Sequence, residues 1–172
     1  MNRPRLSPPV PILPEHDLAG FDCGEPSLND WLRKRSLKNQ ATGASRCFVV
    51  AEGGKVIGYY TLSAGMIERS AAPRAMRRQT PNSLPVLLLG RMAVDRQWHN
   101  QGIGQALLRD ALLRSLAVSA EAGVFALLVH ALSEPARRFY LSRGFVESPL
   151  RPMTLMMTLE TIREIVRGSA SG

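Results

Sequence analysis

The chain has 172 residues, of which 45% are hydrophobic and 21% charged, and this composition excludes a chain that is disordered throughout. Its 22 Lys and Arg against 14 Asp and Glu give a net charge of +8, which favours an anionic partner, although a solvated basic surface without a partner fits equally well. Two cysteines without a CxxC motif argue against a disulfide framework. No apolar run approaches the roughly 20 residues that cross a bilayer. We therefore expect a cytoplasmic protein that does not enter a membrane.

Turn residues and hydrophobic periodicity predict strands that alternate with helices. In chain order we expect an edge strand at 10–13, a helix at 27–38, a hairpin of strands 46–52 and 55–63, a basic loop at 68–83, a strand at 86–94, a helix at 105–119, a strand at 124–130, a helix at 134–143 and two last strands, from 145 and at 152–159. The clearest boundary signals are Ser27 as an N-cap, Gly43 and Gly144 as helix ends, and Gly53 and Gly54 as a hairpin turn. The order predicts an α/β fold with a central mixed sheet flanked by helices. We expect one domain over residues 1–167 and a disordered tail at 168–172.

The segment 92–105 joins the end of a strand to the start of a helix through a turn that contains Gly102 and Gly104. A helix N-terminus presents unpaired N–H groups and the positive end of the helix dipole, which suits an anion such as a pyrophosphate. Two glycines before a helix are also typical of an ordinary tight turn. The segment is not a dinucleotide-binding fingerprint or a P-loop, because the third glycine and the Gly-Lys-Ser/Thr sequence are absent.

Residues 94–108 resemble motif A of the GNAT acetyltransferases, in which Arg/Gln-x-x-Gly-x-Gly/Ala follows the central strand. Gly102 and Gly104 match this pattern, and His99 replaces its first residue, where the family uses a backbone N–H. Residues 133–145 resemble motif B, Phe-Tyr-x-x-x-Gly-Phe, with Ser133 where the family often has Asn. The resemblance implies the GNAT acyl-CoA N-acyltransferase fold, acetyl-CoA as cosubstrate and direct transfer of acetyl to an amine.

The same resemblance implies the site residues. Tyr140 is the implied general acid that protonates the CoA thiolate; the alternative is a core tyrosine that packs on neighbouring aromatic rings. The implied CoA-binding residues are Met92, Ala93, Val94, His99, Asn100, Gln101, Gly102, Ile103, Gly104, Gln105, Ser133 and Pro135. We expect no metal, and no residue stands out as a general base. Trp31 and Trp98 could stack on a nucleotide base, but packing is the commoner use.

A closer resemblance is to the GNAT toxins of bacterial toxin–antitoxin pairs, carried by residues 18–32, 89–95 and the helix of Tyr140. It implies that the acceptor is the α-amino group of an aminoacyl-tRNA, that translation is blocked, and that a ribbon-helix-helix antitoxin encoded next door neutralises the protein; a homodimer is a further option. The basic candidates for tRNA phosphate contacts are Arg33, Lys34, Lys38, Arg77, Arg78 and Arg91. Two alternatives stay open: acetylation of a small amine or of a protein, and an inactive module that binds CoA or a protein. The sequence does not identify the amino acid on the tRNA.

Overall fold

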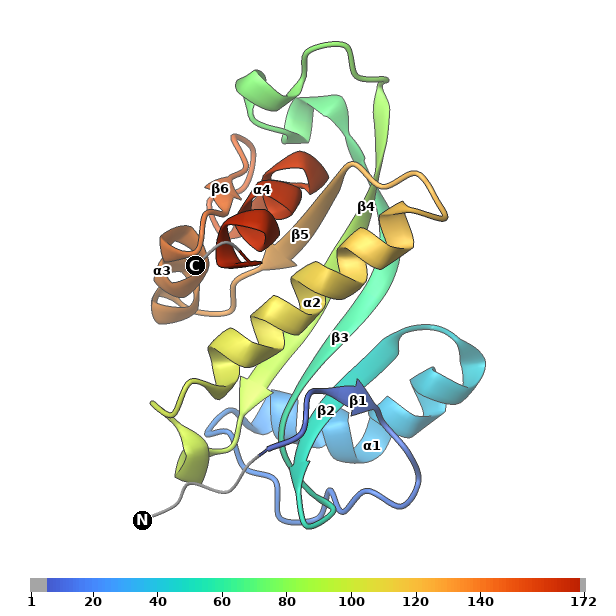
Figure 1. Cartoon of the computed structure of the whole chain (residues 1–172), viewed down its shortest axis with the longest axis vertical. Coiled ribbons are helices and arrows are strands. Elements are labelled where there is room, and N and C mark those ends of the chain that lie inside the picture. The colour runs from blue at the N-terminus through green and yellow to red at the C-terminus, as the bar shows by residue number, and fades with distance from the viewer. Residues whose placement is uncertain (1–5, 171–172) are drawn as a thin grey trace. The chain divides into compact units, whose positions relative to one another are not determined.

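The computed structural model describes residues 6–170 and has, within that range, seven β-strands and four α-helices (Figure 1). The strands are hydrogen-bonded in the order β1-β2-β3-β4-β5-β7-β6. Strands β4 and β5 are parallel, whereas the pairs β1–β2, β2–β3, β5–β7 and β6–β7 are antiparallel. The expected α/β class with a mixed sheet is therefore confirmed.

The chain forms two compact units. Within the described residues, one comprises 6–63 together with Gly90–Ala111, and the other comprises Ala64–Leu89 and 112–170. Strands β3 and β4 and helix α2 each contribute residues to both units. A single domain over residues 1–167 stays a prediction.

In the first unit, helix α1 (Pro26–Thr42) packs on strand β2 (Arg46–Glu52), which forms a hairpin with β3 (Lys55–Glu68) and pairs at its other side with β1 (Val10–Pro11). The hairpin turn lies at Gly53 and Gly54, as predicted, and both have positive φ, 57° and 83°. The core of this unit contains Ile12, Phe21, Trp31, Leu32, Cys47, Val49, Val56, Tyr59 and Ala93.

One boundary of α1 was predicted correctly and the other was wrong. Gly43 ends the helix in the left-handed conformation at φ 78°, and its N–H donates to the Asn39 carbonyl. Ser27, however, is not the N-cap: the helix begins at Pro26 after Glu25, and no side chain caps its start. Proline is favoured at the first helical position because the N–H that it lacks would have no partner within the helix.

The second unit contains part of β4 (Ser83–Val94) beside β5 (Ala126–His130), followed by β7 (Thr154–Thr158) and the short β6 (Val146–Glu147). Helix α3 (Glu134–Ser142) begins after Ser133, and Gly144 beyond its end has φ 101°. The basic loop folds into two short 3-10 helices, Arg69–Ala71 and Arg74–Met76. Ala72, Leu84, Val86, Ala126, Leu128 and Met156 form the core.

Helix α4 (Leu159–Ala170) was not predicted (Figure 1). It buries Leu159 and Ile162, and the Thr158 hydroxyl accepts a hydrogen bond from the Thr161 N–H at 3.2 Å at its start. The tail expected from residue 168 is therefore helical as far as Ala170, and residues 171 and 172 lie outside the described residues.

Candidate functional site

The turn between β4 and α2 (Ile103–Ser119) leaves open space at the start of that helix. We call residues Asp95–Gly102 the β4–α2 turn. Asn100 and Gly102 adopt positive φ, 59° and 83°, and residues 99–102 are exposed. A Cβ added to Gly102 or Gly104 would meet no atom within 4 Å. The N-terminus of a 17-residue helix therefore faces open space, an arrangement that suits an anion.

The start of α2 is seated on strand β3 at a glycine. Ile103 and Leu107 are buried, and a Cβ on Gly58 would lie 3.1 Å from Ile103 Cγ2 and 3.2 Å from Leu107 Cδ1. These contacts are tighter than a side chain at position 58 normally allows, so Gly58 permits the close approach of the helix. The helix begins two residues earlier than predicted.

Side chains of the β4–α2 turn bond to backbone within the turn and at the end of β4. His99 Nε2 lies 2.7 Å from the Val94 carbonyl oxygen; because a carbonyl only accepts, this nitrogen carries the proton. The Gln101 amide donates to the Gln97 carbonyl at 3.2 Å. Of the three residues of β4 among the implied CoA-binding residues, Ala93 is buried and Met92 and Val94 are half-buried. Gln105 is exposed on the first turn of α2.

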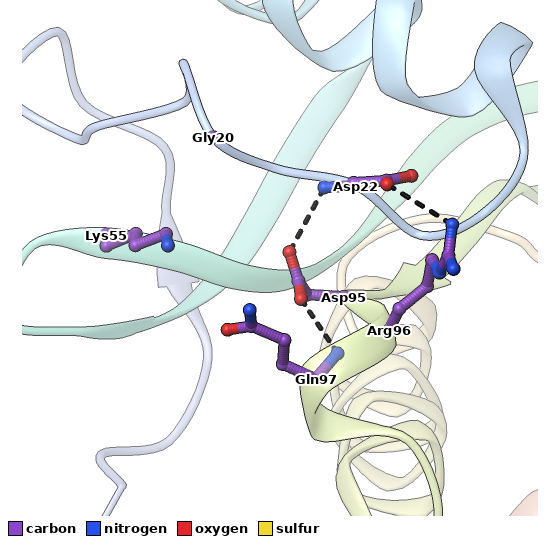
Figure 2. A pocket seen from close by; sticks show the side chains of 6 residues that line it. All are labelled: Gly20, Asp22, Lys55, Asp95, Arg96 and Gln97. Carbon is purple, nitrogen blue, oxygen red and sulfur yellow. Dashed lines mark hydrogen bonds and ion pairs between the residues drawn. The ribbon is translucent and has the colours of Figure 1, made fainter.

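A polar cavity of about 540 Å³ lies beside the β4–α2 turn, within the first unit (Figure 2). Its lining residues are Gly20, Asp22, Lys55, Asp95, Arg96 and Gln97. None of them was predicted as a site residue, although Gly20, Asp22 and Asp95 lie in the segments that carry the closer family resemblance. Asp95 is the buried member, and the signal that could have found it is an aspartate directly after a buried strand and before a turn.

In the second unit, Tyr140 is buried on α3, and its ring makes edge contacts with Phe139 and Phe145 at centroid distances of 5.3 and 5.4 Å. Burial raises the pKa of the phenol above its ordinary value of 10, so the hydroxyl is protonated at neutral pH. This hydroxyl makes no hydrogen bond to another described residue. The ring therefore packs in an aromatic cluster while the proton is left for another acceptor.

Ser133 and Pro135 form the start of α3. The Ser133 hydroxyl accepts from the Ala136 N–H at 3.3 Å, and Pro135 lies in the first helical turn. Ser133 is thus a helix N-cap, which explains why this helix begins where the sequence predicted. His130, which precedes this segment, bonds through Nδ1 to the Thr154 hydroxyl at 2.8 Å, and burial lowers its pKa.

Of the basic residues predicted to contact phosphate, those of the first unit differ in what already engages them. The Arg33 guanidinium donates to the Phe21 carbonyl at 2.7 Å, and Arg91 stacks over Trp31 at 4.5 Å from the ring centroid. Lys34 pairs with Asp30 at 3.8 Å. Lys38 is exposed, and no described residue engages it.

Arg77 and Arg78 are neighbours in the basic loop of the second unit but have different roles there. Arg77 donates from Nε to the Ala72 carbonyl at 2.7 Å and from its terminal nitrogen to the Ser70 carbonyl at 3.0 Å. Arg78 is exposed and makes no bond within the described part of the chain. Arg77 therefore holds the loop together, whereas Arg78 contributes charge alone.

No group of His, Cys, Asp and Glu among the described residues could hold a metal ion. Of the helices between residues 6 and 170, none is long and apolar enough to span a bilayer.

Comparison with known proteins gives consistent matches. A family model described as an acetyltransferase (GNAT) domain matches residues 43–147. The chain is 43% identical over 160 residues to the tRNA-acetylating toxin of Mycobacterium tuberculosis, which covers 93% of this chain and 96% of that protein. The solved structure of AtaT complexed with acetyl-methionyl-tRNAfMet matches with a TM-score of 0.88 and 29% identity, over 94% of this chain and 99% of that one. A tyrosine-to-phenylalanine mutant of AtaT, bound to the C-terminus of the antitoxin AtaR and acetyl-CoA, matches with a TM-score of 0.81 and 28% identity, over 94% and 97% of the two chains.

Proposed function

The chain belongs to the GNAT acetyltransferase family, and we propose that it transfers acetyl from acetyl-CoA to the α-amino group of an aminoacyl-tRNA and thereby blocks translation. The observation that carries this proposal is the 43% identity to a tRNA-acetylating toxin along nearly the whole of both chains. The likeness to AtaT complexed with an acetylated aminoacyl-tRNA supports it.

The β4–α2 turn is the proposed seat of acetyl-CoA. The open space beside Gly102 and Gly104 supports this role, because a pyrophosphate can approach the first N–H groups of α2 without meeting a side chain. Residues 99–105 would surround the pyrophosphate, with Ser133 and Pro135 as further contacts. Backbone N–H groups near Met92–Val94 would stabilise the thioester oxygen as negative charge develops on it.

Tyr140 is the proposed general acid. The neutral amine attacks the thioester carbon, the carbon–sulfur bond breaks, and the departing thiolate takes the phenol proton. The nitrogen that has gained the acetyl group loses a proton to solvent, and solvent returns a proton to the phenolate. A raised phenol pKa supports this role, because it keeps the proton on the oxygen until a base appears. The amine needs no strong enzyme base, since a peptide α-amine already has a pKa of about 7.7–8.0 and an adjacent ester lowers it further.

We propose that the basic residues bind tRNA phosphates, led by the unengaged side chains of Arg78 and Lys38. Lys34 is a weaker candidate because its ammonium group already pairs with the carboxylate of Asp30 in the same helix. Arg33, Arg77 and Arg91 are anchored, although a guanidinium has five N–H donors and keeps some of them for a phosphate. The net charge of +8 supports an anionic acceptor.

The experiment is acetyl transfer to purified charged tRNA over a salt series, with deacylated tRNA as the control. Arg78→Glu should raise the KM for charged tRNA and flatten the salt dependence, because each lost phosphate contact removes a slope of about 0.7–0.9 in log K against log salt. Arg163→Glu, a charge reversal at an exposed residue of α4, is the matched control and should change little. Transfer to a small amine but not to charged tRNA would replace this proposal with a metabolic acetyltransferase.

We also propose that a ribbon-helix-helix antitoxin encoded next door neutralises the enzyme in the cytoplasm, where its substrate is found, and that the enzyme forms a homodimer. A complex of AtaT with the antitoxin AtaR supports an antitoxin partner. Expression of this chain should arrest growth, and coexpression of the neighbouring reading frame should restore it. Light scattering of the purified chain tests the dimer.

A further inference from the structure

Two segments far apart in the sequence are bonded to each other beside the β4–α2 turn (Figure 2). The carboxylate of Asp95, a buried side chain, accepts from the Asp22 N–H at 3.1 Å with one oxygen and from the Gln97 N–H at 3.0 Å with the other. In return, the Arg96 N–H donates to the Asp22 carbonyl at 2.8 Å. A bond in each direction fixes the first residues of the turn against residue 22.

The Asp22 loop, residues 22–24, is itself fixed by helix α1. Asn29 is buried; its side-chain oxygen accepts from the Cys23 N–H at 2.8 Å, and its amide donates to the Asp22 carboxylate at 3.1 Å. The same carboxylate accepts from the Gly24 N–H at 2.9 Å and lies 3.5 Å from the Arg96 guanidinium. The loop therefore cannot shift without breaking bonds at α1 or at the turn.

From this network we infer that Asp95 is a positioning residue, which through the Asp22 loop holds the β4–α2 turn in the shape that binds the pyrophosphate of acetyl-CoA. The inference rests on the proposed function of that turn. The bonds of His99 and Gln101 reach only the turn itself and the adjacent end of β4, whereas the bonds to Asp22 connect the turn, through the Asp22 loop, to α1. The conformation of the seat at Gly102 thus depends on Asp22 and Asn29, which lie outside the turn.

Two variants test this inference from opposite ends of the network. Asp95→Ser leaves a hydroxyl that can still accept from the Gln97 N–H two residues on, but it is too short to reach Asp22. The Kd for CoA, measured by calorimetry, should rise about 10-fold, because loss of a hydrogen bond to a charged group corresponds to roughly 10- to 100-fold when it is fully transmitted. The KM for acetyl-CoA should rise with it, while kcat at saturation stays within about 2-fold, since the transfer step is untouched.

Asn29→Ala frees the Asp22 loop from α1 without touching the turn. It should weaken CoA binding in the same direction by a smaller factor, about 3-fold, and the double variant should fall short of the product of the two effects, because both act through one loop. Glu52→Gln, which removes an exposed carboxylate elsewhere in the first unit, is the control and should bind CoA as the wild type does.

The outcomes separate the inference from the function on which it rests. Wild-type protein that does not bind CoA would overturn the proposed function. Wild-type binding together with unchanged Kd in both variants, each folded by circular dichroism, would overturn only the positioning role. If Asp95→Ser does not fold, Asn29→Ala decides: an unchanged Kd overturns the inference, and a raised Kd with preserved kcat supports it.

Discussion

Replacement of Gly58 by alanine should weaken the cosubstrate site from the far side of helix α2. Gly58 lies on β3, beneath the first two turns of the helix. The added Cβ would stand 3.1 Å from Ile103 Cγ2, 3.2 Å from Leu107 Cδ1 and 3.5 Å from the Ala93 carbonyl oxygen. Since optimal carbon–carbon separations are about 3.5–4.0 Å, the helix has to move by a few tenths of an ångström or its side chains have to leave their rotamers.

The magnitude follows from two opposing terms. Overpacking of a tight core site costs about 1–3 kcal/mol, whereas loss of glycine freedom in the unfolded chain stabilises by about 0.4–1 kcal/mol. The net loss should be about 1–2 kcal/mol, which corresponds to a drop in Tm of roughly 2–8 °C for a chain of this size. Because Ile103 is the first residue of α2, the shift also moves the N–H groups proposed to bind pyrophosphate, and the Kd for CoA should rise.

The assay is thermal unfolding together with calorimetry of CoA binding, with Gly65→Ala as the matched control. Gly65 lies on the same strand, and a Cβ there would meet Val86 and Leu88 at 3.7 and 3.9 Å, which are ordinary contacts. Its Tm should therefore stay level or rise slightly. If Gly58→Ala matches Gly65→Ala in both Tm and CoA affinity, the helix is not seated as tightly as these distances state, and the reasoning fails.

Three further predictions concern the chemistry and the charge of the site. Tyr140→Phe should lower kcat by about 10²- to 10⁴-fold with CoA affinity preserved; near wild-type turnover at saturating acetyl-CoA would remove the general-acid role. Gly104→Glu should weaken acetyl-CoA binding, measured by calorimetry, because the added negative charge repels a phosphate. The variant should keep its stability, because the new side chain enters open space and a negative charge is favourable at a helix N-terminus. Gly123→Glu, also in open space, is its control. The Gly24 N–H that donates to Asp22 holds the pKa of this carboxyl below its ordinary value of 3.8, so the stability that the carboxylate contributes is present above that value and lost as the pH falls below it. The difference in unfolding free energy between wild type and Asp22→Asn should therefore shrink from about pH 5 to about pH 3, and a constant difference in acid titrations would contradict it.

The elements that the sequence predicted well are those whose ends carry a glycine with positive φ. Gly43, the Gly53–Gly54 turn and Gly144 all adopt that conformation. Because glycine adopts a positive φ more readily than any other residue, a glycine in the sequence indicates where such a helix end or turn lies. Helix α4 was missed because the apolar strand before it runs directly into Leu159 and the end of the chain is rich in glycine and serine. A signal was present in Thr158, which caps the helix, and in the buried spacing of Leu159 and Ile162.

The two halves of the candidate site differ in how far sequence could reach. Gly102 and Gly104 could be found because the geometry of a helix start is local and depends on adjacent residues. Asp95 carries a local signal, an aspartate between a buried strand and a turn, but its role could not be predicted, because its bond to Asp22 joins positions 73 residues apart. The sequence therefore predicts the place where a cosubstrate could bind more readily than it predicts the residues that maintain the conformation of that place.

The basic residues show the same limit in terms of charge. The sequence gives the number of guanidinium groups but not their contacts. Arg33 donates a hydrogen bond to the Phe21 carbonyl, and Arg91 stacks on the Trp31 ring. Arg77 donates to two backbone carbonyls of its own loop. Reversal of Arg77 would thus change the shape of the loop as well as its charge, and lost activity would have two explanations. Reversal of Arg78, the exposed neighbour, would change only the charge of the loop. A test of phosphate binding is therefore sound at Arg78 and ambiguous at Arg77, although the two residues are equivalent in every respect that the sequence shows.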